Sequence, residues 1–161
     1  MYYSHFTNQR SKGIDSEERF EKIARSKGYR ILETTTDLDK YAHIDKIIMK
    51  DSKIAMIDVK SNSKYGFIVE LQNNLGYPGW IFGKSDMIAV DRGDNFLIFN
   101  REDILSLVKS NINSNEPKVS VSGEKHIPYT IYTRPQWKDR WILVDDKDLL
   151  KLKHTIWKVK P

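Results

Sequence analysis

The stretch Ile44–Lys60 constrains the fold more than any other part of the sequence. Two apolar runs, at residues 44–49 and 54–59, flank a polar tetrapeptide at residues 50–53. This pattern is typical of two antiparallel β-strands joined by a tight turn. We therefore predict a β-hairpin here and use it as the fixed point for interpreting the rest of the chain.

The position of the turn sets which side chains of the hairpin face each other. A turn centred on Asp51 and Ser52 would place Asp45 directly opposite Asp58, with their Cβ atoms roughly 5 Å apart on one face. Because side chains alternate along a strand, Lys60 lies on the same face as Asp58. Two carboxylates this close repel each other, so folding alone gives no reason for the pair.

A divalent cation would give this pair of carboxylates a purpose. Two carboxylates with a neighbouring backbone carbonyl supply half of an octahedral oxygen site, and water and a substrate phosphate complete it. We therefore predict a metal site formed by Asp45, Asp58 and the carbonyl of Val59. Lys60 would lie within reach of the water in that site.

The pattern Asp45 followed by Asp58-Val59-Lys60 resembles the PD-(D/E)xK nuclease superfamily. The signature of this superfamily is an acid near the start of one strand and an acid-x-lysine at the end of the next. Ile44 stands where the family pattern has proline. Other acid-x-lysine tripeptides occur at residues 51–53, 116–118 and 145–147, but only the Asp58 copy ends an apolar strand with a second acid in register.

The resemblance implies a fold, an activity and partners. The fold is α/β and restriction-endonuclease-like, with an αβββ core and a mixed central sheet flanked by helices, plus additional C-terminal strands and a helix. The activity is Mg²⁺-dependent endonucleolytic cleavage of DNA, including structure-specific or branched DNA, to products with 5′-phosphates, and Mn²⁺ would substitute for Mg²⁺. RNA stays open as a substrate, and many such enzymes act as homodimers. The chain length suits a phage or mobile-element enzyme.

A helix is expected from Ser16, as N-cap, to Gly28, preceded by an N-terminal arm over residues 1–15. At 100° per residue, Glu17 lies about 65°, Glu21 about 105° and Glu18 about 165° from the centre of the apolar face. Glu17 thus borders the core and Glu18 points to water. In the resembled superfamily, a helical glutamate about eleven residues before a Gly-aromatic pair completes the metal site. Glu17 fits that role, and a first-turn acid that stabilises the helix dipole is the alternative.

Further strands are predicted at residues 29–35 and 67–72, with a polar loop through Lys40 between the first strand and the hairpin. In the second of these strands Glu70 and Gln72 share a face, and either could extend the wall of the active site. Together with Glu21 they are secondary candidates. The alternative for Glu70 and Gln72 is that they are polar groups at a strand edge.

The remainder of the chain is expected to contain a hairpin over residues 86–100 and a helix capped by Asn100, followed by strands at 127–133 and 141–144, a last helix and a basic tail. We predict one domain over residues 1–161, with a core at 16–110, a flexible loop at 111–126 and a C-terminal extension at 127–161. Basic residues mixed with aromatics suit phosphate contacts and base stacking. The candidates for nucleic-acid contact are Arg10, Lys12, Arg134, Trp137, Lys138 and Arg140.

The composition limits the possible partners and surroundings of the protein. The net charge of +5 favours polyanions, and the absence of cysteine excludes thiolate zinc sites and suits a reducing cytosol. No apolar run reaches the roughly 20 residues of a membrane span, so we expect no membrane partner and a cytoplasmic location in a bacterium or a phage-infected host. The alternatives to a nuclease are a catalytically inactive nucleic-acid-binding module on the same fold and a protein-interaction domain.

Overall fold

The computed structural model describes residues 3–63 and 66–159, with the side chains of the first helix described from residue 12 onward. The chain divides into two compact units that each draw on separated segments: residues 1–61, 84–99 and 154–161 form unit 1, and residues 62–83 and 100–153 form unit 2. The predicted core at residues 16–110 and the predicted extension at residues 127–161 are, by contrast, each continuous in sequence. The prediction of a single domain stays a prediction.

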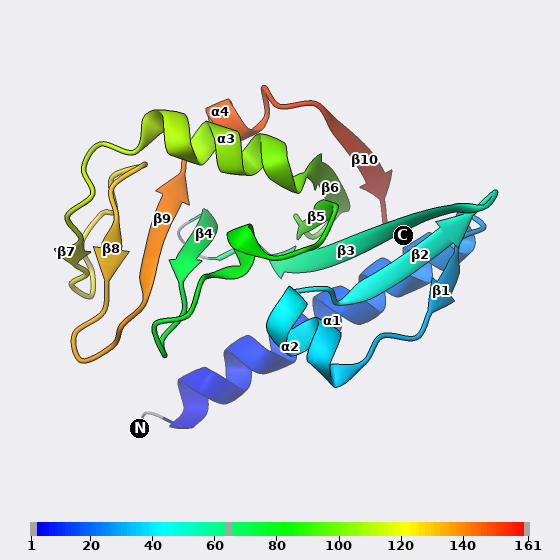
Figure 1. The fold of residues 1–161 in the computed structure, drawn as a ribbon, viewed down its shortest axis with the longest axis horizontal. Helices are drawn as coiled ribbons and strands as arrows, with labels where there is room; N and C mark the ends of the chain where they lie inside the picture. The colour runs from blue at the N-terminus through cyan, green and yellow to red at the C-terminus, as the bar shows by residue number, and fades with distance from the viewer. Residues whose placement is uncertain (1–2, 64–65, 160–161) are drawn as a thin grey trace. The chain divides into compact units, whose positions relative to one another are not determined.

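Unit 1 is a mixed sheet with two helices (Figure 1). Its strand order is β1-β2-β3-β5-β6-β10, and β3 and β5 run parallel while β1–β2, β2–β3 and β6–β10 are antiparallel. A mixed α/β sheet was expected from the sequence. The elements are α1 (Tyr3–Ser26), β1 (Arg30–Leu32), α2 (Thr36–Ala42), β2 (Lys46–Lys50), β3 (Lys53–Ser61), β5 (Met87–Asp91), β6 (Asn95–Asn100) and β10 (His154–Lys158).

The predicted hairpin forms in the predicted register. Met49 pairs with Ile54 and Ile47 with Met56, and the turn residues Asp51 and Ser52 have φ values of 50° and 63°. Positive φ at both central residues defines a type I′ turn, whose twist matches that of the flanking strands. The tight turn therefore fixes which side chains of β2 and β3 share a face.

Helix α1 begins far earlier than the sequence suggested. It runs from Tyr3 to Ser26, so the predicted N-terminal arm is wrong from residue 3 onward, and Ser16 is a buried residue of the helix interior and not its cap. The sequence misled because serine followed by two acids is a strong start signal, whereas tertiary packing decides where a helix actually begins. Lys27 lies beyond the helix end and is exposed.

The apolar side of α1 packs on the sheet through Phe20, Ile23 and Ala24, which are 0%, 8% and 0% exposed. Phe20 stacks on Trp157 with ring centroids 5.4 Å apart and meets Phe96 edge-on at 5.5 Å. Trp157 belongs to β10, the segment that was expected to be a basic tail. That prediction is wrong because the segment pairs with β6 and buries Trp157 against Phe20 of α1, while Lys158 stays exposed.

Helix α2 replaces the predicted polar loop between β1 and the hairpin. Thr35 caps it by accepting a hydrogen bond from the Leu38 amide, and His43 ends it in the left-handed conformation with φ 53°. The helix buries no residue completely, so it lacks the apolar stripe that sequence periodicity can detect. The order helix, strand, hairpin of the expected core is present, with α2 inserted before the hairpin.

Unit 2 contains a four-stranded sheet in the order β4-β9-β8-β7, together with two helices and a 3₁₀ turn. Helix α3 begins after its predicted cap, Asn100, and buries its three predicted apolar residues, Ile104, Leu105 and Val108. The elements are β4 (Phe67–Gln72), η1 (Trp80–Phe82), α3 (Arg101–Asn111), β7 (Lys118–Val119), β8 (Tyr132–Thr133), β9 (Arg140–Val144) and α4 (Asp146–Leu149).

Two predictions within unit 2 need correction. The supposedly flexible segment 111–126 contains β7, which pairs with β8 in parallel. The predicted strand at 127–133 shrinks to Tyr132–Thr133, because Tyr129 has φ 61° and its neighbours form turns. Among the described residues, no helix has both the length and the apolar character needed to cross a membrane.

Candidate functional site

The acidic face of the hairpin lies where β2 and β3 open away from the turn. Asp45 precedes β2, and its amide donates to the Ile57 carbonyl at 2.9 Å. The Val59 amide donates to Asp45 Oδ2 at 2.7 Å. Asp45 is thus tied to β3 through both its backbone and its carboxylate.

Asp58 is the most unusual residue of this face. It is 0% exposed, and neither of its carboxylate oxygens receives a well-aligned hydrogen bond among the described residues, although Lys60 Nζ lies 2.5 Å from Oδ1. Burial raises the pKa of Asp58 well above its ordinary value, the Lys60 ammonium opposes that rise, and the Asp45 carboxylate adds to it. An acid in this position is costly to keep ionised.

Glu17 of α1 approaches the same group of charges. Its side chain is 33% exposed, and its carboxylate lies 3.7 Å from Lys46 Nζ. Burial, and then the charge of Asp45, raise the pKa of Glu17, while Lys46 opposes the rise. Glu18 is exposed, as the helix geometry predicted.

The carboxylate of Glu21, a secondary candidate, is paired with two cationic side chains. It accepts two hydrogen bonds from Arg25, at 2.8 and 3.0 Å, and lies 3.4 Å from Lys46 Nζ. The hydrogen bond from Arg25 is the main reason that the pKa of Glu21 is lowered. Glu21 therefore shares Lys46 with Glu17 and is held on the outer side of the group.

Sequence reasoning missed a further acid, Asp39. It lies on α2, and its carboxyl is close enough to Asp45 to hydrogen-bond with it. Partial burial of that carboxyl, and then the charge of Asp45, raise the pKa of Asp39, although the residue as a whole is exposed. The segment was expected to be a loop, and only the placement of α2 beside the hairpin brings this acid to the site.

The structure therefore brings Glu17, Asp45, Asp58 and Lys60 into one neighbourhood and adds Asp39 and Lys46. Within the described ranges, no set of three or more His, Cys, Asp or Glu side chains is arranged to hold a metal ion. Carboxylate and carbonyl oxygens are nevertheless the ligands that Mg²⁺ prefers, and Mg²⁺ commonly takes only one or two carboxylates from the protein. The carboxylate oxygens of Asp58 are buried and receive no well-aligned hydrogen bond among the described residues, and they are of the type that binds such a cation.

The direction of the Val59 carbonyl follows from the hydrogen bond of the Val59 amide. In a strand, the N–H and C=O of one residue point to the same side, because paired residues exchange both hydrogen bonds. The Val59 N–H points to Asp45. Its carbonyl therefore faces the same side as the Asp45 carboxylate, as the metal prediction requires.

The other predicted residues belong to other elements of the chain. Glu70 and Gln72 belong to β4 in unit 2, where Gln72 Nε2 donates to the Lys138 carbonyl at 2.6 Å; their part in an active site stays a prediction. Arg134 pairs with the buried Asp139 at 2.6 Å and lies 5.1 Å over the ring of Trp137. Lys12, Trp137, Lys138 and Arg140 are exposed, and the side chain of Arg10 lies outside the described residues.

Comparisons with known proteins give few matches. No protein-family model matches the chain, and no curated protein matches it. Among solved structures, the chain is similar to a bacterial homing endonuclease, I-Ssp6803I, with 18% sequence identity over 68% of this chain and 84% of that chain, and a TM-score of 0.45.

Proposed function

We propose that this protein is a divalent-metal-dependent phosphodiesterase that cuts DNA, with its active site at the open end of the β2–β3 hairpin. The observation that carries the proposal is Asp58, an acid with no exposed surface that lies beside Asp45 and 2.5 Å from Lys60. Burying this charge opposes folding, so a role in chemistry is the simplest reason for its presence. The similarity to PD-(D/E)xK nucleases in residues 45 and 58–60 supports the same reading.

In this proposal Asp45, Asp58 and the Val59 carbonyl hold Mg²⁺ or Mn²⁺, and Glu17 contributes directly or through water. When bound, the cation offsets charge on the phosphate and lowers the pKa of a nearby water. The oxygen of a water would form a bond to phosphorus as a nearby carboxylate or the solvent takes its proton, and the bond from phosphorus to the 3′-oxygen would break as that oxygen takes a proton from solvent. A 5′-phosphate and a 3′-hydroxyl result.

Lys60 has a distinct part in this reaction. Its side chain is 25% exposed, so the ammonium can leave Asp58 Oδ1 and reach the phosphate or the attacking water. A cation next to carboxylates keeps its proton, which favours positioning and charge stabilisation over a role as general base. Burial raises the pKa values of Asp39 and Glu17, so either carboxylate is a stronger base than an acid at the surface.

The test is cleavage of labelled duplex and branched DNA with and without Mg²⁺. The matched control lies on the same hairpin, where the exposed Asp51 and Lys53 repeat the acid-x-lysine pattern at the turn. We expect Asp58→Asn and Lys60→Met to abolish cutting, and Asp51→Asn and Lys53→Met to leave it unchanged. Cutting that survives Asp58→Asn would overturn the proposal.

A catalytically inactive nucleic-acid-binding module is the second candidate. It is favoured by the direct Lys60–Asp58 ion pair, which occupies one oxygen of the proposed metal site. In that case the wild-type protein binds DNA in a salt-sensitive manner but does not cut it at any Mg²⁺ or Mn²⁺ concentration. The same DNA panel therefore separates the two candidates.

A further inference from the structure

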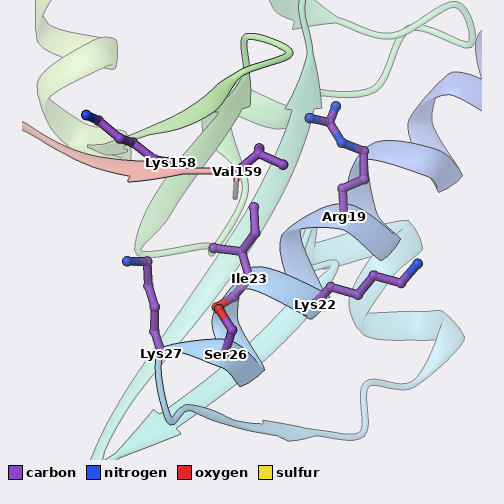
Figure 2. Close-up of a pocket in the computed structure, with 7 residues that line it drawn as sticks. All are labelled: Arg19, Lys22, Ile23, Ser26, Lys27, Lys158 and Val159. Carbon is purple, nitrogen blue, oxygen red and sulfur yellow. The ribbon is translucent and has the colours of Figure 1, made fainter. Parts of the chain in front are cut away.

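A basic hollow lies on unit 1 between α1 and β10. It has a volume of about 380 Å³, and its lining includes Lys22, Lys27 and Lys158 but no acidic residue. Figure 2 shows Ile23 and Val159 in its middle, with the ammonium groups of Lys27 and Lys158 on one side and Lys22 reaching out from α1 on the other. An apolar floor with a cationic rim suits a ligand that joins negative charges to less polar groups.

The walls of the hollow are held in place by contacts outside it. Arg19 donates to both carboxylate oxygens of the buried Asp91, at 3.0 and 2.7 Å, so its charge is already balanced. The Val159 amide donates to the Asp94 carbonyl at 2.9 Å, which fixes the end of β10. The Lys27 ammonium lies 5.7 Å over the ring of Trp157.

The two remaining cations are uncompensated. Lys22 and Lys158 are both exposed, and no ion pair or ring contact is found for either within the described part of the chain. Three ammonium groups around one hollow repel each other in the absence of an anion. The arrangement is therefore electrostatically suited to binding a group with more than one negative charge along its length.

The hollow is separate from the acidic site. On α1, the directions of Arg19, Lys22, Ile23 and Ser26 average about 170° from those of Glu17 and Glu21 at 100° per residue. The two groups therefore occupy opposite sides of the helix. A ligand in the hollow does not touch the carboxylates of the hairpin.

We propose that the hollow between α1 and β10 binds the phosphodiester backbone of nucleic acid at a place remote from the acidic site. The inference rests on the proposed function in taking nucleic acid as the ligand. The lysines contact successive phosphates and release their counterions, while Ile23 and Val159 contact the sugars. The hollow anchors the DNA without reading its sequence, since backbone contacts carry no base information.

The test is equilibrium binding of a labelled duplex by the full chain in EDTA, where no cutting occurs, across a range of salt concentrations. The variant Lys22→Ala/Lys158→Ala removes two rim charges and no described contact. The matched control, Lys109→Ala/Lys147→Ala, removes two exposed lysines of unit 2 and the same charge. We expect the rim variant to bind roughly tenfold or more weakly, with the slope of log K against log salt reduced by about two, and the control to change much less.

Equal losses in the two double variants would overturn the inference, because they would reflect net charge and not the hollow. Titration followed by amide NMR signals of residues 22–27 identifies the ligand. The inference is supported if duplex DNA shifts these signals while inorganic phosphate or polyglutamate, at the same concentration of charged groups, does not. Equal shifts with either of these probes overturn it.

The outcome is independent of catalysis. If the protein never cuts DNA but the rim variant binds DNA more weakly, the proposed binding role of the hollow is supported and the proposed nuclease activity is refuted. Cutting by a protein whose rim and control variants bind equally well would do the reverse.

Discussion

The Val59 amide donates a hydrogen bond to Asp45 Oδ2 over 2.7 Å, so a carboxylate from the start of one strand is attached to the backbone of the next. This bond holds the Asp45 side chain against the residue that separates Asp58 from Lys60. The acid-x-lysine unit and its partner acid are thereby locked together by the sheet.

The first prediction concerns pH and stability. The pKa of Asp58 is raised in the folded protein, so its contribution to stability is complete below the unfolded pKa of about 3.9 and is lost as the pH rises through the folded value. Glu17 acts in the same direction. We therefore expect Asp58→Asn to raise the free energy of unfolding more at pH 8 than at pH 5, as measured by urea unfolding. The prediction is contradicted if the difference in free energy of unfolding between the wild type and Asp58→Asn is the same at both pH values.

The second prediction concerns metal binding. A cation that binds only the folded protein stabilises it by about 2.7 kcal/mol when its concentration is 100 times Kd. We expect Mg²⁺ or Mn²⁺ to raise the melting temperature of the wild type at pH 8, but not of Asp45→Asn or Asp58→Asn. Calorimetric titration checks the same point, with Asp51→Asn as the control. Equal heats in all four proteins would remove the metal from the mechanism.

The third prediction separates Glu17 from its neighbour Glu18. Glu17 faces the acidic site, whereas Glu18 is exposed on the same helix turn. We expect Glu17→Gln to slow single-turnover cutting by roughly 10–100-fold, in the range seen when a group that orients a metal site is removed, and Glu18→Gln to have no effect. If Glu17→Gln and Glu18→Gln cut DNA at equal rates, Glu17 has no role in catalysis and serves only as the ion-pair partner of Lys46.

The fourth prediction concerns Gly79, which lies before η1. A Cβ atom at this position would come within 2.2 Å of the Glu70 carbonyl oxygen and 2.5 Å of its carbon, and both are backbone atoms that cannot move aside. We expect Gly79→Ala to destabilise the protein by about 3 kcal/mol or more, as severe clashes do. The free energy of unfolding from urea titration measures this, and a loss below 1 kcal/mol would show that β4 and η1 are not packed as described.

The fifth prediction uses Gly13, in the interior of α1, as the opposite case. A Cβ atom there would meet nothing within 4 Å. Because glycine in a helix interior costs about 0.5–1 kcal/mol relative to alanine, Gly13→Ala should stabilise the protein by that amount. If the helix began at Ser16, as the sequence alone suggested, the substitution would have no such effect.

The sequence by itself determined the elements whose signals are local. The turn at Asp51 and Ser52 set the register of β2 and β3, so the relation between Asp45, Asp58 and Lys60 could be predicted from alternation alone. Asn100 likewise predicted the start of α3, because its side chain caps the helix and the apolar spacing follows directly. In these cases one chain segment contains all the interactions that decide its conformation.

Tertiary structure decided everything that depends on distant partners. Local sequence signals are weak for the true start of α1, for the strand β10 and for the short helix α2. Helix α1 and strand β10 stabilise each other through the packing of Phe20 on Trp157. Only that packing brings Asp39 and Lys46 to the acidic site and places Lys22 and Lys158 on the lining of one hollow. The burial that raises the pKa of Asp58 also depends on tertiary structure, because desolvation is a property of a site's surroundings and not of its sequence.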